Sequence, residues 1–385
     1  MMKKNISTIN KHYYSKYTPL KEDSENQITF MQPQVKQRNS NLELYRIIVM
    51  LLIVAHHYVV NSGLMEEMAK EPLSSRSLFF YIFGMWGKTG INCFVMITGY
   101  FMCKSQITIH KFLKLLLQVE FYNILIFIIF TWSGYQSFNL KESLRAFLPV
   151  KSIADDFTSC FLVFYLFIPF LNILIRNLSK QQHLLLVLLC LFTYTLMGTA
   201  SFHVTMNYVS WFCVLYFIAS YIRIYGFFPQ FSTAKWGGIT FVLMLLSILS
   251  VLFMAYKISF GIIANIPYKY VSDSNKFLSV ATGVALFMTF KNFKMKYNKW
   301  INTIAASTFG VLLIHANSDT MRQWLWRDTL QNAEQFYMSY ACAHAMISVI
   351  TIFAICIAID YIRIHTLEKW MFIVIDKYLA KYKLK

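Results

Sequence analysis

Long runs of apolar residues, separated by short polar segments, dominate the chain. A helix needs about 20 apolar residues to cross the ~30 Å hydrocarbon core of a bilayer. Runs of this kind recur along the sequence and predict an all-α fold, a polytopic membrane helix bundle of about ten transmembrane helices. The predicted spans are 43–62, 79–103, 112–134, 157–177, 183–201, 205–225, 236–256, 277–291, 301–320 and 338–362.

The two ends of the chain are polar and basic. We expect a polar cytosolic N-terminal tail over residues 1–42, a transmembrane domain over 43–365 and a basic cytosolic C-terminal tail over 366–385. Most Lys and Arg residues fall in the two tails and in the loops on the same side of the membrane. The positive-inside rule therefore predicts that both termini are cytosolic.

Composition supports the membrane assignment. Of 385 residues, 57% are hydrophobic and 14% are charged, whereas soluble domains have about 45–50% and about 25%. A lipid bilayer is thus an expected partner. The net charge of +18 follows from the topology, so we do not expect nucleic-acid binding. No Cys or His spacing is typical of a metal site, and oligomeric state is not predicted.

The first predicted span carries polar residues that recur on one helical face. At ~100° per residue, His57 lies about 20° from Arg46, and Glu43 lies about 60° from Arg46. Asn61 extends the same stripe, whereas His56 points some 80° away from Arg46 and is the lesser candidate.

This stripe has two interpretations. A rise of 1.5 Å per residue places His57 roughly 16 Å above Arg46, near the middle of the bilayer if Arg46 lies at the cytosolic boundary. Ionisable groups at that depth cost about 2.5–3.5 kcal/mol. Such residues either bind neighbouring helices and hold the bundle together or carry function, and their alignment favours function.

The second predicted span combines four glycines with a lysine. Small residues at 84, 87, 90 and 99 are typical of helices that approach each other closely. Lys88 would lie well inside the span, where it needs a carboxylate, a ligand phosphate or a water-filled cavity.

Two motifs carry a resemblance to a known family. They are Asn41-Leu-Glu43-Leu-Tyr-Arg46 followed by His56-His57, and Gly87-x-x-Gly90-Ile-x-x-Phe94-x-x-x-x-Gly99-Tyr100-Phe101. Together they resemble the opening of the acyltransferase type 3 family, bacterial ten-helix membrane enzymes that acetylate cell-surface polysaccharides. Weaker similarities follow at Tyr216–Arg223, at Ala305–His315 and at Asp360-Tyr-Ile-Arg363.

The resemblance implies roles for particular residues. The family pattern Arg-x10-His fits Arg46 and His57. The family often has Arg-x-x-Arg, implicated in donor binding, where this chain has Lys111 and Lys114. Lysine can meet a phosphate as a point charge but not bidentately, so these lysines are either donor-binding residues or positive-inside anchors.

The implied activity is O-acylation, and O-acetylation above all. An acyl group would move from acetyl-CoA, or another acyl-CoA, to a hydroxyl of a cell-surface or capsular polysaccharide or its lipid-linked precursor, at the bacterial cytoplasmic membrane. His57 is the natural base or acyl carrier, since imidazole titrates near neutral pH. Arg46, Lys111 and Lys114 would meet the donor phosphates, and Glu43 would hold Arg46.

Some assignments stay open at this point. His315, in the ninth predicted span, either assists His57 or is a satisfied interior histidine. The rival class is a transporter or flippase for a polysaccharide or a lipid-linked glycan. Transporters often show internal symmetry and helices broken by Gly or Pro, and with 13 Gly, 7 Pro and no visible repeat the chain favours the enzyme.

Overall fold

A computed structural model describes residues 38–153, 156–200, 202–262 and 266–381. Throughout these ranges the chain forms helices joined by loops, and no strand is present in them. The predicted all-α class is therefore confirmed.

The elements are as follows, in chain order: α1 (Ser40–Val60), α2 (Leu64–Lys70), α3 (Ser75–Gly84), α4 (Gly87–Met102), α5 (Ile109–Trp132), α6 (Leu140–Ala146), α7 (Phe157–Asn177), α8 (Lys180–Cys190), η2 (Leu191–Leu196), α9 (Met197–Thr199), α10 (Tyr208–Tyr225), α11 (Thr233–Ser259), α12 (Phe277–Asn292), α13 (Lys299–Ala306), α14 (Thr308–His315), α15 (Asp319–Arg322), η3 (Gln323–Thr329), α16 (Asn332–Gln335), α17 (Ala341–Arg363), η4 (Ile364–Glu368) and α18 (Lys369–Lys381).

Within the described residues, seven helical runs are long and apolar enough to cross a membrane. They are Ser40–Val60, Ile109–Trp132, Phe157–Asn177, Lys180–Thr199, Tyr208–Tyr225, Thr233–Ser259 and Ala341–Tyr378. The predicted span 277–291 corresponds to the shorter apolar helix α12. The predicted spans 79–103 and 301–320 are each divided into two helices, α3 with α4 and α13 with α14.

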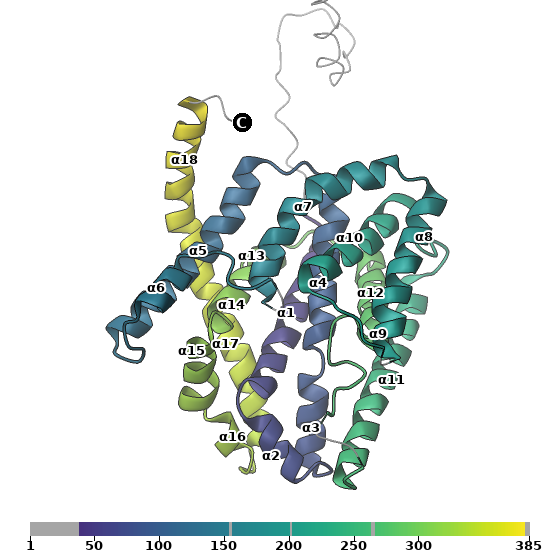
Figure 1. Ribbon diagram of the computed structural model, residues 1–385, viewed down its shortest axis with the longest axis vertical. Helices are drawn as coiled ribbons and strands as arrows, with labels where there is room; N and C mark the ends of the chain where they lie inside the picture. Colours follow the sequence, from purple (N-terminus) through teal and green to yellow (C-terminus); the bar gives the residue numbers. More distant parts are fainter. Residues whose placement is uncertain (1–37, 154–155, 201, 263–265, 382–385) are drawn as a thin grey trace, which may run out of the picture. The chain divides into compact units, whose positions relative to one another are not determined.

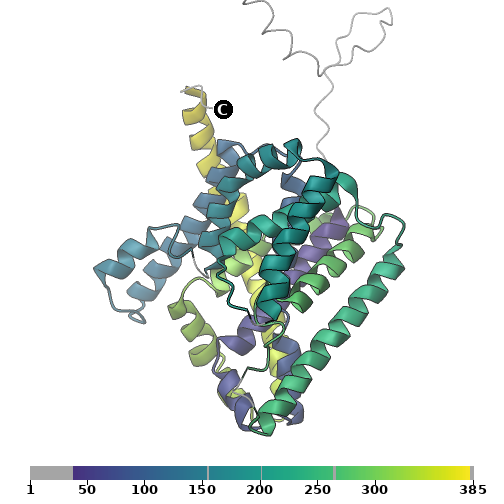
Figure 2. The same ribbon diagram turned by 45° about the vertical axis from the view of Figure 1, so that its right-hand side comes forward.

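Helix α1 lies at the centre of the helical packing. It contacts α3, α4, α12, α13, α14 and α17, and side chains along its whole length are buried. Figures 1 and 2 show α11 at the edge of the helices, on the side away from α5 and α6. Its apolar side chains are largely exposed, as expected of a helix that faces lipid.

The break between α3 and α4 lies where α1 approaches most closely. A Cβ on Gly87 would lie 2.2 Å from Cγ of His56, so only glycine fits there. This contact confirms the predicted close approach of helices at the glycines of the second span. The turn at Met85 and Trp86 ends α3 and leaves its last carbonyl groups without partners inside the helix.

The predicted tails lie largely at the ends of the described region. Residues 1–37 fall outside it, and α1 begins at Ser40, within the predicted N-terminal tail. At the other end, residues 366–381 continue from α17 as η4 and α18. The division of the chain into three parts stays a prediction.

Candidate functional site

The structure brings two predicted candidates into direct contact. Nδ1 of His57, near the end of α1, lies 2.9 Å from Nε2 of His315, at the end of α14. The other ring nitrogen of His315, Nδ1, lies 2.6 Å from the backbone carbonyl oxygen of Val311. His315 is 0% exposed, and these two contacts use both of its ring nitrogens.

The hydrogen-bond network assigns the protons of the neutral pair. A carbonyl oxygen only accepts, so Nδ1 of His315 donates to Val311. Nε2 of His315 therefore carries a lone pair and accepts a hydrogen bond from Nδ1 of His57. It follows that Nε2 of His57 carries a lone pair and no proton. His315 thus fixes His57 in the tautomer that can take a proton or attack a carbonyl carbon.

Lys88 lies beside this pair, at the start of α4. Its Nζ donates a hydrogen bond of 2.6 Å to the phenol oxygen of Tyr208, whose hydroxyl lies 3.4 Å from Oδ1 of Asp273. Lys88 also lines a cavity of about 60 Å³ together with His56 and His57. The direct partner of Lys88 is thus a phenol, and the expected carboxylate, Asp273, is reached only through that phenol.

His56 has a structural contact that distinguishes it from its neighbour. Its Nδ1 donates a hydrogen bond of 2.6 Å to the carbonyl oxygen of Gly84, in the last turn of α3. The ring also packs against Gly87. His56 therefore satisfies a carbonyl that the helix break leaves free.

Glu43 and Arg46 form an ion pair on α1. Nη1 of Arg46 lies 3.5 Å from Oε2 of Glu43, and Glu43 is buried. The guanidinium of Arg46 stands over the ring of Phe94 at 6.0 Å, and Phe94 also lines the cavity of His57. Arg46 thus lies against a residue of α4 that also lines the cavity beside His57.

Lys111 and Lys114 lie apart from the histidine pair, in the first turns of α5. Both are exposed. Nζ of Lys111 donates to the hydroxyl of Ser105 and to the carbonyl of Gln106, each at 2.7 Å. Lys114 forms an ion pair with Glu368. Exposed ammonium groups with such surface partners are able to turn towards an anionic ligand.

A second polar cluster joins α5 to α17 and to η4, which follows α17. Oδ1 of the buried Asp360 accepts hydrogen bonds from Gln118 at 3.2 Å, Tyr122 at 2.8 Å and Arg363 at 2.8 Å. Arg363 also pairs with Glu368 at 2.8 Å. Lys114, which pairs with Glu368, is the second base, so the two acids of the cluster face two bases. We call this set of six residues the α5–α17 network.

Sequence reasoning did not find the α5–α17 network as a unit. The spacing of Asp360 and Arg363, three residues apart in an apolar helix, was the available signal. Gly310 provides the space for it, because a Cβ there would lie 2.3 Å from Cγ of Asp360. Tyr208, the partner of Lys88, also escaped prediction, because nothing in its local sequence indicates that contact.

The described residues show no metal centre. Within them, no group of three or more His, Cys, Asp or Glu side chains is placed to hold a metal ion. The residues present are an imidazole pair, an ammonium group and a guanidinium–carboxylate pair. These groups can move protons and stabilise negative charge.

The fold is that of a helical membrane protein with ionisable side chains inside its bundle. A family model described as an acyltransferase domain matches residues 39–361, and the chain therefore belongs to the acyltransferase type 3 family. No curated protein and no solved structure matches the chain. Membership of this family makes the protein a membrane acyltransferase and favours an enzyme over a transporter.

Proposed function

We propose that the protein is an O-acyltransferase of the bacterial cytoplasmic membrane. It moves an acetyl group from acetyl-CoA to a hydroxyl of a cell-surface or capsular polysaccharide or its lipid-linked precursor. The observation that carries this proposal is the His57–His315 pair, which leaves a lone pair on Nε2 of His57 beside the ammonium group of Lys88.

The topology belongs to the same proposal. Three further crossings add to the seven long helical runs and give ten spans. They are α3 together with α4, α13 together with α14, and α12 alone. Both termini then lie in the cytosol, as the distribution of Lys and Arg predicts. Arg46, Lys111 and Lys114 lie near the cytosolic ends of their helices in this topology, and the histidine pair lies deeper.

The residues divide the reaction between them. Nε2 of His57 takes the proton of the acceptor hydroxyl, and the oxygen forms a bond to the carbonyl carbon of the thioester. The ammonium of Lys88 stabilises the negative charge that develops on the carbonyl oxygen. As the carbon–sulfur bond breaks, His57 returns its proton to the leaving thiolate, so the imidazole ends as it began.

The donor phosphates require cations on the cytosolic side. The Arg46 side chain is 21% exposed, so part of its guanidinium remains open to an anion while Glu43 holds the rest. Lys111 and Lys114 add two exposed positive charges. These residues fit a polyanion that approaches from the cytosol.

The first test measures acyl transfer directly. Membranes that contain the wild-type protein receive radiolabelled acetyl-CoA and a glycan acceptor, and label is counted in the glycan fraction. We expect label that depends on the protein. Absence of transfer from acetyl-CoA and from longer acyl-CoAs, in protein that binds neither, would contradict the proposal and favour a transporter.

A rapid-quench experiment then separates direct transfer from an acyl-histidine intermediate. Direct transfer predicts no protein-bound label during full turnover. Label that appears on His57 and passes to the glycan would instead show that the imidazole carries the acyl group.

A further inference from the structure

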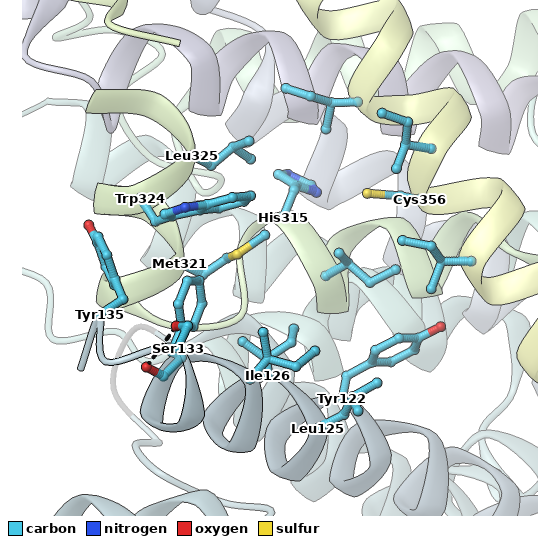
Figure 3. A pocket seen from close by; sticks show the side chains of 16 residues that line it. Tyr122, Leu125, Ile126, Ser133, Tyr135, His315, Met321, Trp324, Leu325 and Cys356 are labelled. Atoms are coloured by element: carbon cyan, nitrogen blue, oxygen red, sulfur yellow. Dashed lines mark hydrogen bonds between the residues drawn. The ribbon is translucent and has the colours of Figure 1, made fainter. Parts of the chain in front are cut away.

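An apolar groove of about 490 Å³ lies between α5 and α17, with α14 and η3 closing its inner wall. This volume lies in the ~300–1,000 Å³ range of ligand pockets. Figure 3 shows His315 in the wall, among Met321, Leu325 and Cys356. His315, the partner of His57, is therefore part of the wall of this groove.

The groove has a closed end and an open side. Tyr122 lines one end, and its hydroxyl is tied to Asp360 of the α5–α17 network. Along the side, Ile129 and Ile355 are 50% and 54% exposed, towards the region that lipid would occupy. A hydrocarbon chain could thus enter laterally from the bilayer and lie against isoleucines of both helices.

A polar pocket of about 500 Å³ adjoins this groove. Ile126 and Phe130 line both of them. The polar pocket is lined by three cations, Arg145, Lys151 and Arg322, and by two acids, Asp156 and Asp319.

Both acids of the polar pocket accept hydrogen bonds from neighbouring residues. Oδ1 of Asp319 accepts from Arg322 at 2.7 Å, and Asp156 accepts from the backbone NH of Ser159 at 2.9 Å. Nε of Arg322 is buried and has no hydrogen-bond partner among the described residues. The side chains that line the pocket thus include three cations and two acids, a balance that favours an anion.

We propose that these two cavities together bind the acceptor as a lipid-linked glycan. Its hydrocarbon chain lies in the apolar groove, its linking phosphate lies in the polar pocket near Arg322, and its first sugars lie towards His57. This assignment rests on the proposed function, and it narrows the acceptor from any glycan to one attached to a lipid through phosphate.

The charge arrangement favours this occupant over two others. Nη2 of Arg322 donates a hydrogen bond of 3.3 Å to the backbone carbonyl of Ala316, the residue after His315, so a phosphate held there lies near the histidine pair. The cations proposed for the donor lie elsewhere, on α1 and at the start of α5. An ordinary bilayer lipid would fill the groove but has no glycan to present to His57.

Binding is tested with the full-length protein in phosphatidylcholine nanodiscs. The probe is a polyprenyl phosphate with a diazirine on its chain, and mass spectrometry maps the cross-links. We expect labels on residues 126–135 and 352–359.

Ile355→Trp should fill the groove and reduce labelling at least about tenfold. Ile350→Trp is the matched control, since Ile350 is exposed on the same helix but lies outside the groove, and it should leave labelling unchanged.

The phosphate contact has its own control. Arg322→Gln should weaken binding of the polyprenyl phosphate about tenfold, the usual loss for a hydrogen bond to a charged group. It should leave binding of the uncharged polyprenol unchanged. Equal weakening of both ligands would overturn the phosphate contact.

Two competition results and two acyl-transfer results would overturn the inference. Phosphatidylglycerol that displaces the probe equally well would make the groove a site for bilayer lipid. Palmitoyl-CoA that displaces the probe equally well would assign the groove to the acyl donor.

Acyl transfer to a water-soluble glycan, without labelling of the groove, would contradict the lipid-linked acceptor and leave the proposed function intact. Labelling of the groove with no acyl transfer from any acyl-CoA would instead contradict the proposed function, and with it the role of acceptor.

Discussion

Two polar regions lie inside this bundle, and they differ in what their charges contact. In the α5–α17 network, Asp360 and Glu368 face Arg363 and Lys114, so each charge has an opposite charge at contact distance. At the histidine pair, Nε2 of His57 keeps a lone pair, and Lys88 donates to a neutral phenol beside a cavity.

The difference shows why a buried charge alone does not identify an active site. A charge that is neutralised by its neighbours holds helices together, whereas a base with a free lone pair next to a cavity can react. We therefore expect the two regions to respond differently to substitution. Changes at the histidine pair should reduce the rate with the fold intact, and changes in the network should reduce stability.

The largest effect is expected for His57→Asn. Asparagine keeps a donor that can reach His315 but cannot take a proton from the acceptor. We expect acyl transfer to fall by about 10²–10⁴-fold, with an unchanged elution profile in detergent. The matched control is His56→Asn, which should keep substantial activity. Equal losses of acyl transfer in both variants would show that His57 has no catalytic role that His56 lacks.

Lys88→Met should have the next largest effect. Methionine keeps the apolar stem but removes the charge that faces the developing oxyanion, so kcat should fall by about 10²-fold. Lys88→Arg should recover part of this loss. A change in KM for the acyl donor with kcat preserved would show that Lys88 binds substrate rather than stabilising the transition state.

His315 is expected to act through His57 as a positioning residue. His315→Phe removes the acceptor that fixes the tautomer of His57, and we expect a loss of roughly 10- to 100-fold in kcat. His315→Gln offers a carbonyl oxygen to Nδ1 of His57 and should restore most of the activity. A glutamine variant as inactive as the phenylalanine variant would contradict this role.

Lys111→Gln should have a small effect that is confined to the donor. Loss of one exposed positive charge should raise KM for acetyl-CoA by about threefold, as for other exposed ion pairs. The effect should shrink as salt is added, because exposed charges are screened. An unchanged KM at low salt would make Lys111 a membrane anchor only.

Asp360→Asn should change the activity of folded protein least. The substitution removes one of the two acidic partners of the buried Arg363. Removing one partner of a buried ion pair typically costs about 3–5 kcal/mol of stability. We expect a lower Tm in detergent and less folded protein, but a specific activity close to that of the wild type. A large loss of kcat at an unchanged Tm would place the network in the reaction.

Local sequence was sufficient for the all-α class and for the polar face of α1. Both depend on periodicity, which records which residues share a face. The glycines of the second span also predicted close packing, because small side chains permit it. These features depend on spacing within one segment, and the structure confirms the all-α class and the close packing at the glycines.

The contacts between distant segments could not be predicted in this way. His57 and His315 are separated by 258 positions, and no periodicity states which helices become neighbours. The turn at Met85 and Trp86 divides a predicted span because α1 packs there, which is a tertiary effect. The family resemblance implied that Lys114 is either a donor-binding residue or a positive-inside anchor, and its ion pair with Glu368 also gives it a structural role.

The most direct test compares His57→Asn and Asp360→Asn in single-turnover acetyl transfer, per mole of folded purified protein. The account predicts that the histidine variant keeps its Tm and loses transfer, whereas the aspartate variant loses Tm and keeps transfer. The reverse pattern, with an active His57→Asn protein, would contradict the assignment of His57 as the reacting group.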